Sequence, residues 1–195
     1  MKIRTMLFTV IVAMTTSVAS AQPQTSVDVS KSPGKANVAA TATVTATVQA
    51  IDPATRIVTL KDKNGKVVEV EVGDEARNFD QLKVGDIVTT EYRQAVSLSL
   101  EKASGPRSET QQTIEERSAP GAKPGGTIGR VVTVIADVVS VDAKAKSVRL
   151  KGPKGNVVDV IVEDPEQIKH VRKGDQVKVV YTEALAISVK PGANQ

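Results

Sequence analysis

The chain of 195 residues has no cysteine and no tryptophan, and its one histidine is His170. Without cysteine there is no disulfide framework, no thiolate nucleophile and no thiolate metal site. Aromatic residues make up 2% of the sequence, so any core must be built from Val, Ala, Leu and Ile, and a small domain of this kind buries little area. Beyond the first residues, no stretch approaches the roughly 20 apolar residues of a membrane-spanning helix.

The first residues have the three parts of a secretion signal. A positive start at Lys2 and Arg4 precedes a short apolar run and a stretch of small, polar residues. Ala19 and Ala21 have the spacing that signal peptidase recognises, so residues 1–21 are predicted to be removed. The remainder is expected to be a soluble periplasmic protein, with full secretion as the alternative, because an exported chain without cysteine suits a bacterial periplasm.

An internal repeat covers most of the remaining chain. Val44 aligned on Val134 begins a match of 31 residues at an offset of 90, in which 13 positions are identical. After Asp74 and Asp164 the offset becomes 89 and the match continues past Tyr92 and Tyr181. A collinear match of this length indicates a duplicated domain, although two copies are too few for a solenoid.

Each copy has the pattern of five strands. Apolar residues occupy every second position over residues 44–50, which is the period of a half-buried strand. Asn64-Gly65 predicts a tight hairpin turn, and Asp164-Pro165 predicts a short helix after the third strand. A fourth strand is expected to end at Tyr92 or Tyr181, and a fifth follows it. This order predicts an all-β fold of two tandem five-stranded OB-like barrels, each with one short helix between strands 3 and 4; another small five-stranded barrel is the alternative.

The composition between and around the copies predicts the domain boundaries. The segments are a signal peptide (1–21), a disordered leader (22–37), OB-like repeat 1 (38–102), a Gly/Pro/Ser-rich linker (103–130), OB-like repeat 2 (131–191) and a tail (192–195). Within the linker, residues 121–126 are expected to form a flexible joint.

The positions that the two copies share are those of turns, helix starts and core. The matched pairs are Asp52 and Asp142, Gly65 and Gly155, Asp74 and Asp164, Gly85 and Gly174, and Tyr92 and Tyr181. The aspartates are expected to form turn bonds or helix caps, and the glycines to supply backbone geometry. The tyrosines are expected as buried rings with bonded hydroxyls.

One run of residues resembles a known group of proteins. Asn78-Phe79-Asp80-Gln81-Leu82-Lys83-Val84-Gly85-Asp86, followed by a strand and Tyr-x-x-Ala, resembles a recurring group of uncharacterised exported proteins of Gram-negative bacteria with tandem OB-like repeats. More remotely, each repeat is similar in strand order, and in its Leu-Lys-Val-Gly-Asp turn, to the periplasmic OB-fold copper chaperones. Those proteins bind Cu(I) through a histidine, two methionines and a tryptophan. This sequence lacks that ligand set, so the resemblance implies the barrel and the compartment.

The residues offer little reactive chemistry. His170 lies between Lys169 and Arg172 and is expected at the surface, so neither a metal site nor another cofactor is predicted. No nucleophile and base occur in a recognisable arrangement, so the chain is not expected to be an enzyme. Nucleic-acid binding is disfavoured because single strands need aromatic stacking platforms, and the net charge of +4 is spread along the chain.

These observations predict an exported, non-enzymatic protein of the cell envelope with a binding or structural role. Its partner is an envelope protein or another ligand, reached through exposed strand edges or the linker. The alternative is a weak, copper-chaperone-like metal-binding protein that uses His170 and nearby carboxylates. Single-stranded nucleic-acid binding ranks third, and the oligomeric state stays open.

Overall fold

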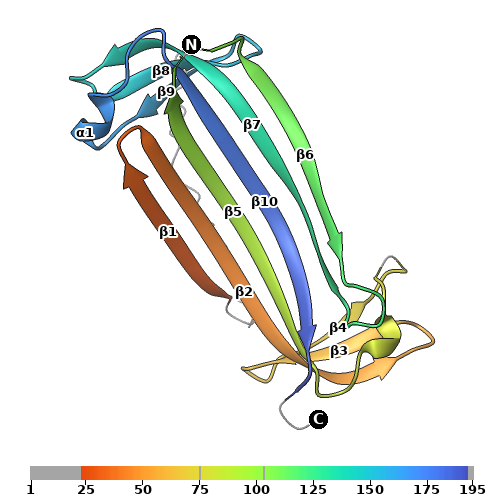
Figure 1. Ribbon diagram of the computed structural model, residues 1–195. Helices are drawn as coiled ribbons and strands as arrows, with labels where there is room; N and C mark the ends of the chain where they lie inside the picture. Colours follow the sequence, from red (N-terminus) through yellow and green to blue (C-terminus); the bar gives the residue numbers. More distant parts are fainter. Residues whose placement is uncertain (1–22, 75, 103, 193–195) are drawn as a thin grey trace.

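A computed structural model of the protein describes residues 23–74, 76–102 and 104–192 (Figure 1). The expected signal peptide lies outside these residues. The fold is all-β, as predicted: ten strands form one antiparallel sheet. Among the described residues, no helix has the length and hydropathy to cross a membrane.

The two halves of the chain contribute the same series of elements. The first half supplies β1 (Gln24–Ser32), β2 (Lys35–Asp52), β3 (Ile57–Asp62), β4 (Val67–Glu71), the 3-10 turn η1 (Phe79–Gln81) and β5 (Ile87–Glu101). The second half supplies β6 (Ser108–Arg117), β7 (Gly125–Asp142), β8 (Ser147–Lys151), β9 (Val157–Ile161), the helical turn α1 (Pro165–Ile168) and β10 (Gln176–Lys190). A short helical turn therefore stands between the third and fourth strands of each repeat.

A pseudo-twofold axis relates the two halves. Across the middle, the strand order is β1-β2-β5-β10-β7-β6, and β5 pairs with β10 along its whole length. In that pair Gln94 lies opposite Glu183. These two residues occupy equivalent positions in the repeats, so the axis passes between them, perpendicular to the sheet.

The two separate barrels are not confirmed, because the described strands form a single open sheet. The expected fourth and fifth strands of each repeat are one strand of 15 residues, β5 or β10. Neither segment contains Gly or Pro, so nothing breaks the strand where the corner of a barrel would be. Each long strand pairs along one edge with its own half, β5 with β2 and β10 with β7, and along the other edge with the other long strand. Neither strand therefore turns to close its own repeat.

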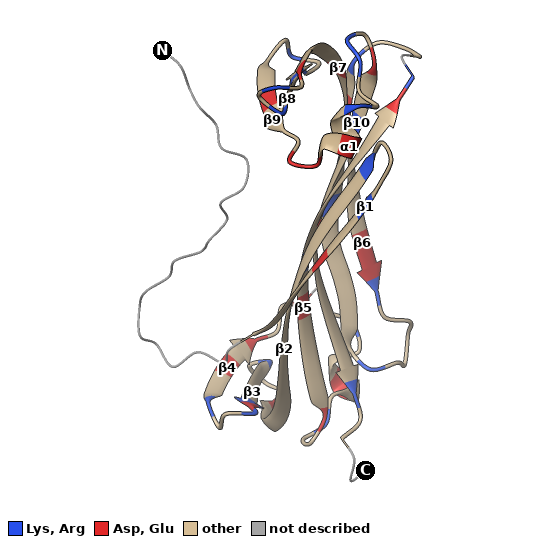
Figure 2. Cartoon of the chain, turned by 90° about the vertical axis from the view of Figure 1, so that its left-hand side faces the viewer, with Lys and Arg blue, Asp and Glu red and all other residues tan. Residues whose placement is uncertain are grey.

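Each end of the sheet folds over into a small module. Strand β2 has a bulge between Val48 and Ala50, and β7 has the equivalent bulge between Val138 and Ser140. A bulge bends a strand and increases its twist. Beyond the two bulges, β3, β4 and η1 form the first end module, and β8, β9 and α1 form the second. Both modules stand on the same side of the sheet (Figure 2).

The buried core is confined to the ends. In the second module the buried apolar residues are Ala136, Val138, Val148, Leu150 and Ile168. In the first module Val48 and Val58 are buried. In the middle section, Ala39 is the one buried apolar residue among those that the structure describes. The long strands are therefore held together by backbone pairing, with little covering their faces.

The expected disordered leader is wrong over most of its length, because residues 24–32 form β1 and residue 35 begins β2. Pro33-Gly34 supplies the turn between them, and Gly34 has a φ of 70°, a conformation that glycine adopts at little cost. Proline followed by glycine favours a type II turn, whereas two-residue hairpins usually have type I′ or II′ turns. The dipeptide therefore indicates a turn but does not by itself predict paired strands on either side of it.

The expected linker also contains sheet. Residues 108–117 form β6, which pairs with the start of β7. Ile114 is the one aliphatic residue of β6, so hydrophobic periodicity could not reveal this strand. The glycines nearby are needed for close packing: a Cβ on Gly129 would lie 2.5 Å from the Glu183 carbonyl oxygen, and one on Gly126 would lie 2.5 Å from that of Glu116.

Candidate functional site: the central apolar face

Alternation along the long strands gives the middle of the sheet two unlike faces. The residues on one side are Val27 and Val29 of β1, Val38, Ala40, Ala42 and Val44 of β2, Tyr92, Val96 and Leu98 of β5, Val179, Tyr181 and Leu185 of β10, and Ile128, Val132 and Val134 of β7. We call this set the central apolar face. The opposite side carries mainly threonine, serine and alanine, such as Thr43, Ser97 and Thr133.

The end modules stand on the side of the central apolar face. Ala136 and Val177 pair across β7 and β10, and both belong to the packed cluster of the second module. The pair of Ala136 and Val177 is the next on the same side of the sheet after the pair of Val134 and Val179. The core of the second module and the central apolar face are therefore continuous. The face is therefore bounded by a module at each end and open between them (Figure 2).

No residue of the central apolar face is buried, and several are exposed. Ile128 is 62% exposed, Val27 66% and Val29 58%, and Leu185 and Tyr92 are each 37% exposed. No element within the described residues packs on the middle of this face. Contiguous exposed apolar surface of this kind commonly marks an interaction site.

A small polar network lies at the centre of the face, on the pseudo-twofold axis. Glu183 accepts hydrogen bonds from the Tyr92 hydroxyl at 2.5 Å and from Arg130 Nε at 3.1 Å. Gln94 Nε2 donates to the Tyr181 hydroxyl at 3.2 Å. The Arg130 guanidinium also lies 5.9 Å from the centre of the Tyr181 ring, within the range of a cation–π contact.

The network shifts two acid–base equilibria. The hydrogen bond to Glu183, with partial burial and the nearby negative charge, raises the pKa of Tyr92 to about 12. The same bond from Tyr92, followed by those from Arg130, lowers the pKa of Glu183. Both shifts favour a neutral tyrosine beside an ionised glutamate near neutral pH, so the central network is stable rather than poised for proton transfer.

The tyrosines are where the sequence-based interpretation needs correction. Tyr92 and Tyr181 were expected inside closed cores. Their hydroxyls are bonded, but the rings lie on the open face, and Tyr92 is 37% exposed. The reason is that β5 and β10 do not close barrels, so the side of each strand that would have faced a core faces open space.

The other repeated positions lie at turns and do not converge on one another. Asp52 accepts from the Ala54 amide at 2.9 Å, and Asp142 from the Lys144 amide at 3.0 Å, which are the expected turn bonds. Asp164 caps α1 by accepting from the Glu166 amide at 2.9 Å, whereas Asp74 pairs with Arg56 at 3.6 Å. The glycines Gly65, Gly85, Gly155 and Gly174 all have positive φ, as turn positions require.

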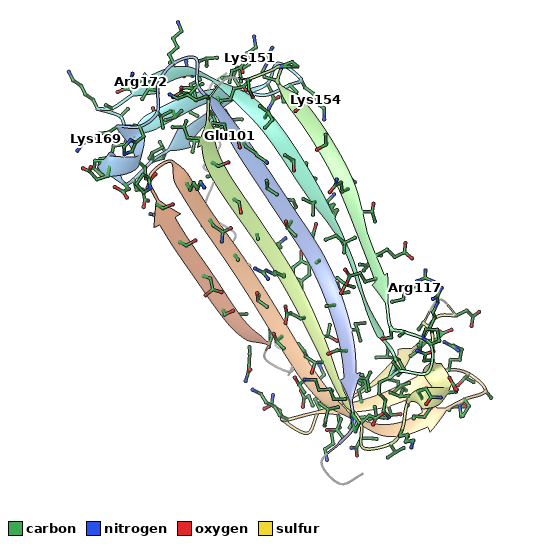
Figure 3. The ribbon with its side chains drawn as sticks, in the orientation of Figure 1. Glu101, Arg117, Lys151, Lys154, Lys169 and Arg172 are labelled. Carbon is green, nitrogen blue, oxygen red and sulfur yellow. The ribbon has the colours of Figure 1, made fainter. Side chains whose placement is uncertain are left out.

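His170 lies at the surface, just after α1, and its amide donates to the Gln167 carbonyl at 3.3 Å. Within the part of the chain that the structure describes, no three His, Asp or Glu side chains gather around a common point. The labelled basic residues Lys151, Lys169 and Arg172 stand around the second end module, away from the middle of the sheet (Figure 3).

Sequence analysis missed the contacts that join the two halves. Asn78 and Gln167 occupy equivalent positions near η1 and in α1. Asn78 Nδ2 donates to the Ala119 carbonyl at 2.7 Å, and Gln167 Nε2 donates to the Ser32 carbonyl at 2.8 Å. Each amide therefore binds the hairpin turn of the opposite half. The repeat shows that Asn78 and Gln167 are equivalent, but their partners, Ala119 and Ser32, are too distant in the sequence to be predicted from it.

The strongest of these contacts involves a buried charge. The Asp86 side chain is fully buried, and its Oδ2 lies 2.6 Å from Lys123 Nζ in the β6–β7 loop. The same lysine donates to the Gln81 carbonyl at 2.9 Å. Lys123 belongs to the stretch expected to be a flexible joint; instead, it ties that loop to the first end module, because a buried carboxylate needs a charged partner.

Two half-open hollows lie beside the central apolar face, near the first end module. One has a volume of about 250 Å³ and is lined mainly by apolar residues that include Val44, Leu60 and Val68. The other has about 280 Å³ and is more polar, with Thr45 and Lys63 among its lining residues. Both fall below the roughly 300–1,000 Å³ of sites for drug-sized ligands.

No protein-family model, curated protein or solved structure matches the chain. Function is therefore inferred from the geometry of the sheet and the chemistry of its faces.

Proposed function

We propose that this chain is an exported, non-enzymatic binding or structural protein of the cell envelope, and that the central apolar face is its binding site. The observation that carries the proposal is that this face is apolar and uncovered. A sheet with one apolar face is stable when that face packs against another layer. The start at Lys2 and Arg4 and the small residues at Ala19 and Ala21 support export.

We infer further that each half is an OB-like repeat left open because its last strand stays straight and pairs with that of the other half. The order of β2, β3, β4, a helical turn and β5 supports this, since it is the order of an OB-type barrel with its last two strands merged. In this view residues 38–102 and 131–191 are the duplicated units. The last strands of the two units then pair with each other at the middle of one sheet, which is how the central apolar face arises.

The size of the face favours a protein partner over a small ligand. Its five strands and the polar edge strand β6, at about 4.8 Å spacing, make it roughly 24 Å wide with this rim included, and the nine residues of a strand such as β1 make it roughly 30 Å long. A surface of these dimensions suits a second protein layer. The ionisable groups on the face bond to one another, with Glu183 holding both Tyr92 and Arg130, which supports a structural role over a catalytic one.

Site-specific photocrosslinking in the cells that make the protein tests this proposal. A photoreactive amino acid at Ile128, on the apolar face, is expected to give a discrete light-dependent adduct. The control is Thr127, the adjacent residue on the opposite face of β7. Equal labelling at both positions, or none at Ile128, would show that the face has no specific partner, and the proposed function would then be abandoned.

A further inference from the structure

We infer that the central apolar face is covered by the same face of a second copy of this chain, so that the protein is a homodimer of two packed sheets. This inference rests on the proposed function, because it takes the face as the binding site and names its occupant. The need for a cover is strong: in the middle section, among the described residues, Ala39 is the one buried apolar residue. A single sheet layer with both faces in water gains little hydrophobic stabilisation.

The area of the face matches what a stable dimer needs. A face of roughly 24 by 30 Å offers about 700 Å² per copy. Two copies would then bury about 1,400 Å² in total, within the range of about 1,200–2,000 Å² for specific protein interfaces. A small ligand or a single added strand would leave most of this surface exposed.

The symmetry of the face favours a second copy as the occupant. The pseudo-twofold axis between Gln94 and Glu183 places Tyr92 and Leu185 on one side of the centre, and Val96 and Tyr181 on the other. The face is thus two similar apolar patches around one polar centre. A second copy can therefore meet this surface with apolar patch on apolar patch and centre on centre, which is the self-complementary contact of an isologous interface.

The charges at the centre are compatible with burial. Glu183 accepts bonds from Tyr92 and Arg130 within one copy, so its charge has its partners before the faces meet. Pairing and hydrogen bonding are the conditions under which a buried charge is tolerated. The residues of β6 on this side, among them Glu109 and Glu115, lie at the rim, where interfaces are commonly polar.

The end modules determine how a second sheet can approach. Both stand on the side of the central apolar face (Figure 2), so a partner must fit between them. The central strands β5 and β10 have 15 residues each, which is roughly 50 Å, whereas six strands are roughly 24 Å wide. A second sheet therefore fits across the middle with its strands at a steep angle, the orthogonal mode of sheet packing.

Sedimentation equilibrium over a concentration series tests the inference on the purified protein in the form that accumulates in cells. We expect twice the mass of one chain. Ile128→Arg should shift the equilibrium to monomer, with at least about a hundredfold weaker association, because burying the new charge at the interface costs more in desolvation than a pair with Glu115 returns. Its far-UV circular dichroism should be unchanged, since the new arginine lies opposite Glu115 on β6.

Thr127→Arg is the matched control. It places the same charge one residue away on the same strand, opposite Glu116, but on the other face, so the dimer should persist. Val29→Arg, with Ser30→Arg as its control on β1, repeats the comparison at a second position in case Ile128→Arg fails to fold. A monomeric wild-type protein at all concentrations would overturn the inference, and so would a dimer that survives both apolar-face variants or dissociates with Thr127→Arg.

The two proposals fail in different ways. If the purified protein is a monomer but position 128 still crosslinks specifically to another protein in cells, the dimer is wrong and the proposed function stands. If position 128 is covered by nothing in either experiment, both are wrong.

Discussion

The two tyrosines at the centre of the sheet have equivalent positions but different hydrogen-bond roles. Tyr92 donates to Glu183, whereas the Tyr181 hydroxyl receives a bond from Gln94. The difference arises because the residues on the pseudo-twofold axis differ: Gln94 in one half, Glu183 in the other. One substitution between the copies thus gives the centre a single negative charge, which Arg130 neutralises.

This asymmetry predicts a pH dependence. The pKa of Tyr92 is raised to about 12 in the folded protein, above an unfolded value of about 10. A raised pKa means that its contribution to stability is fully present below pH 10 and is lost as the pH rises through about 12. The stability advantage of wild type over Tyr92→Phe should therefore shrink across this range.

Urea unfolding at a series of alkaline pH values measures the effect. Tyr181→Phe is the comparison, because the Tyr181 hydroxyl accepts from the Gln94 amide and has only the weakest of the effects on the pKa of Glu183. An advantage over Tyr92→Phe that stays constant from pH 9 to above pH 12 would show that the Tyr92–Glu183 bond does not contribute to folding.

Among the elements, the loops that connect strands also join the two halves of the chain. The β1–β2 turn contacts α1 through Gln167, and the β6–β7 loop contacts the first end module through Asn78 and Lys123. These contacts are long-range in sequence and occur at both ends. They hold each long hairpin against the opposite module, so the central strands are fixed at their ends rather than by packing on their faces.

The ion pair of Lys123 with Asp86 gives a prediction at this scale. Lys123→Ala would leave a fully buried carboxylate without its charged partner, and we expect a loss of about 3 kcal/mol in the free energy of unfolding. Lys154→Ala is the matched control: it removes a pair with Glu109 in which the lysine is 77% exposed, so the loss should stay below about 1 kcal/mol. Similar losses in chemical denaturation would contradict the structural role given to Lys123.

At the scale of the whole molecule, the chain has the arrangement of an intertwined dimer joined into one polypeptide. β5 and β10 meet at the pseudo-twofold axis, and each half supplies three strands of the middle section. This pairing explains why neither repeat closes into a barrel. The edge of β5 that would close the first repeat is occupied by β10, and the edge of β10 that would close the second is occupied by β5. A half on its own would expose β10 or β5 as an open edge, which is a template for pairing.

A fragment of residues 104–192 tests this arrangement. With Ile128→Arg included to prevent association through the apolar face, it should dimerise through its β10 edge. Glu183 would then lie opposite a second Glu183, and like charges directly opposite are unfavourable. Glu183→Gln, which copies Gln94 of the first half, should strengthen the fragment dimer several-fold in sedimentation experiments. An unchanged or weaker dimer would argue against pairing across this axis.

The sequence alone determined the local features. Alternation predicted the strands, the offset of 90 revealed the duplication, and the turns at Asp52 and Asp142 were expected from residue type. These features depend on neighbours within a few positions, which sequence patterns record directly. The all-β class followed from them.

Tertiary structure decided which strand pairs with which. The segment after Tyr92 could turn to close its own repeat, or run straight on between its own β2 and the β10 of the other half. Long-range pairing decides between these two routes, and both satisfy the same alternation. The polar strand β6 was equally hidden, since backbone bonds to β7 hold it without an apolar signal. The central apolar face exists because the long strands run straight on. The sequence alternation identified the apolar residues, but only the pairing of β5 with β10 places them on one open face.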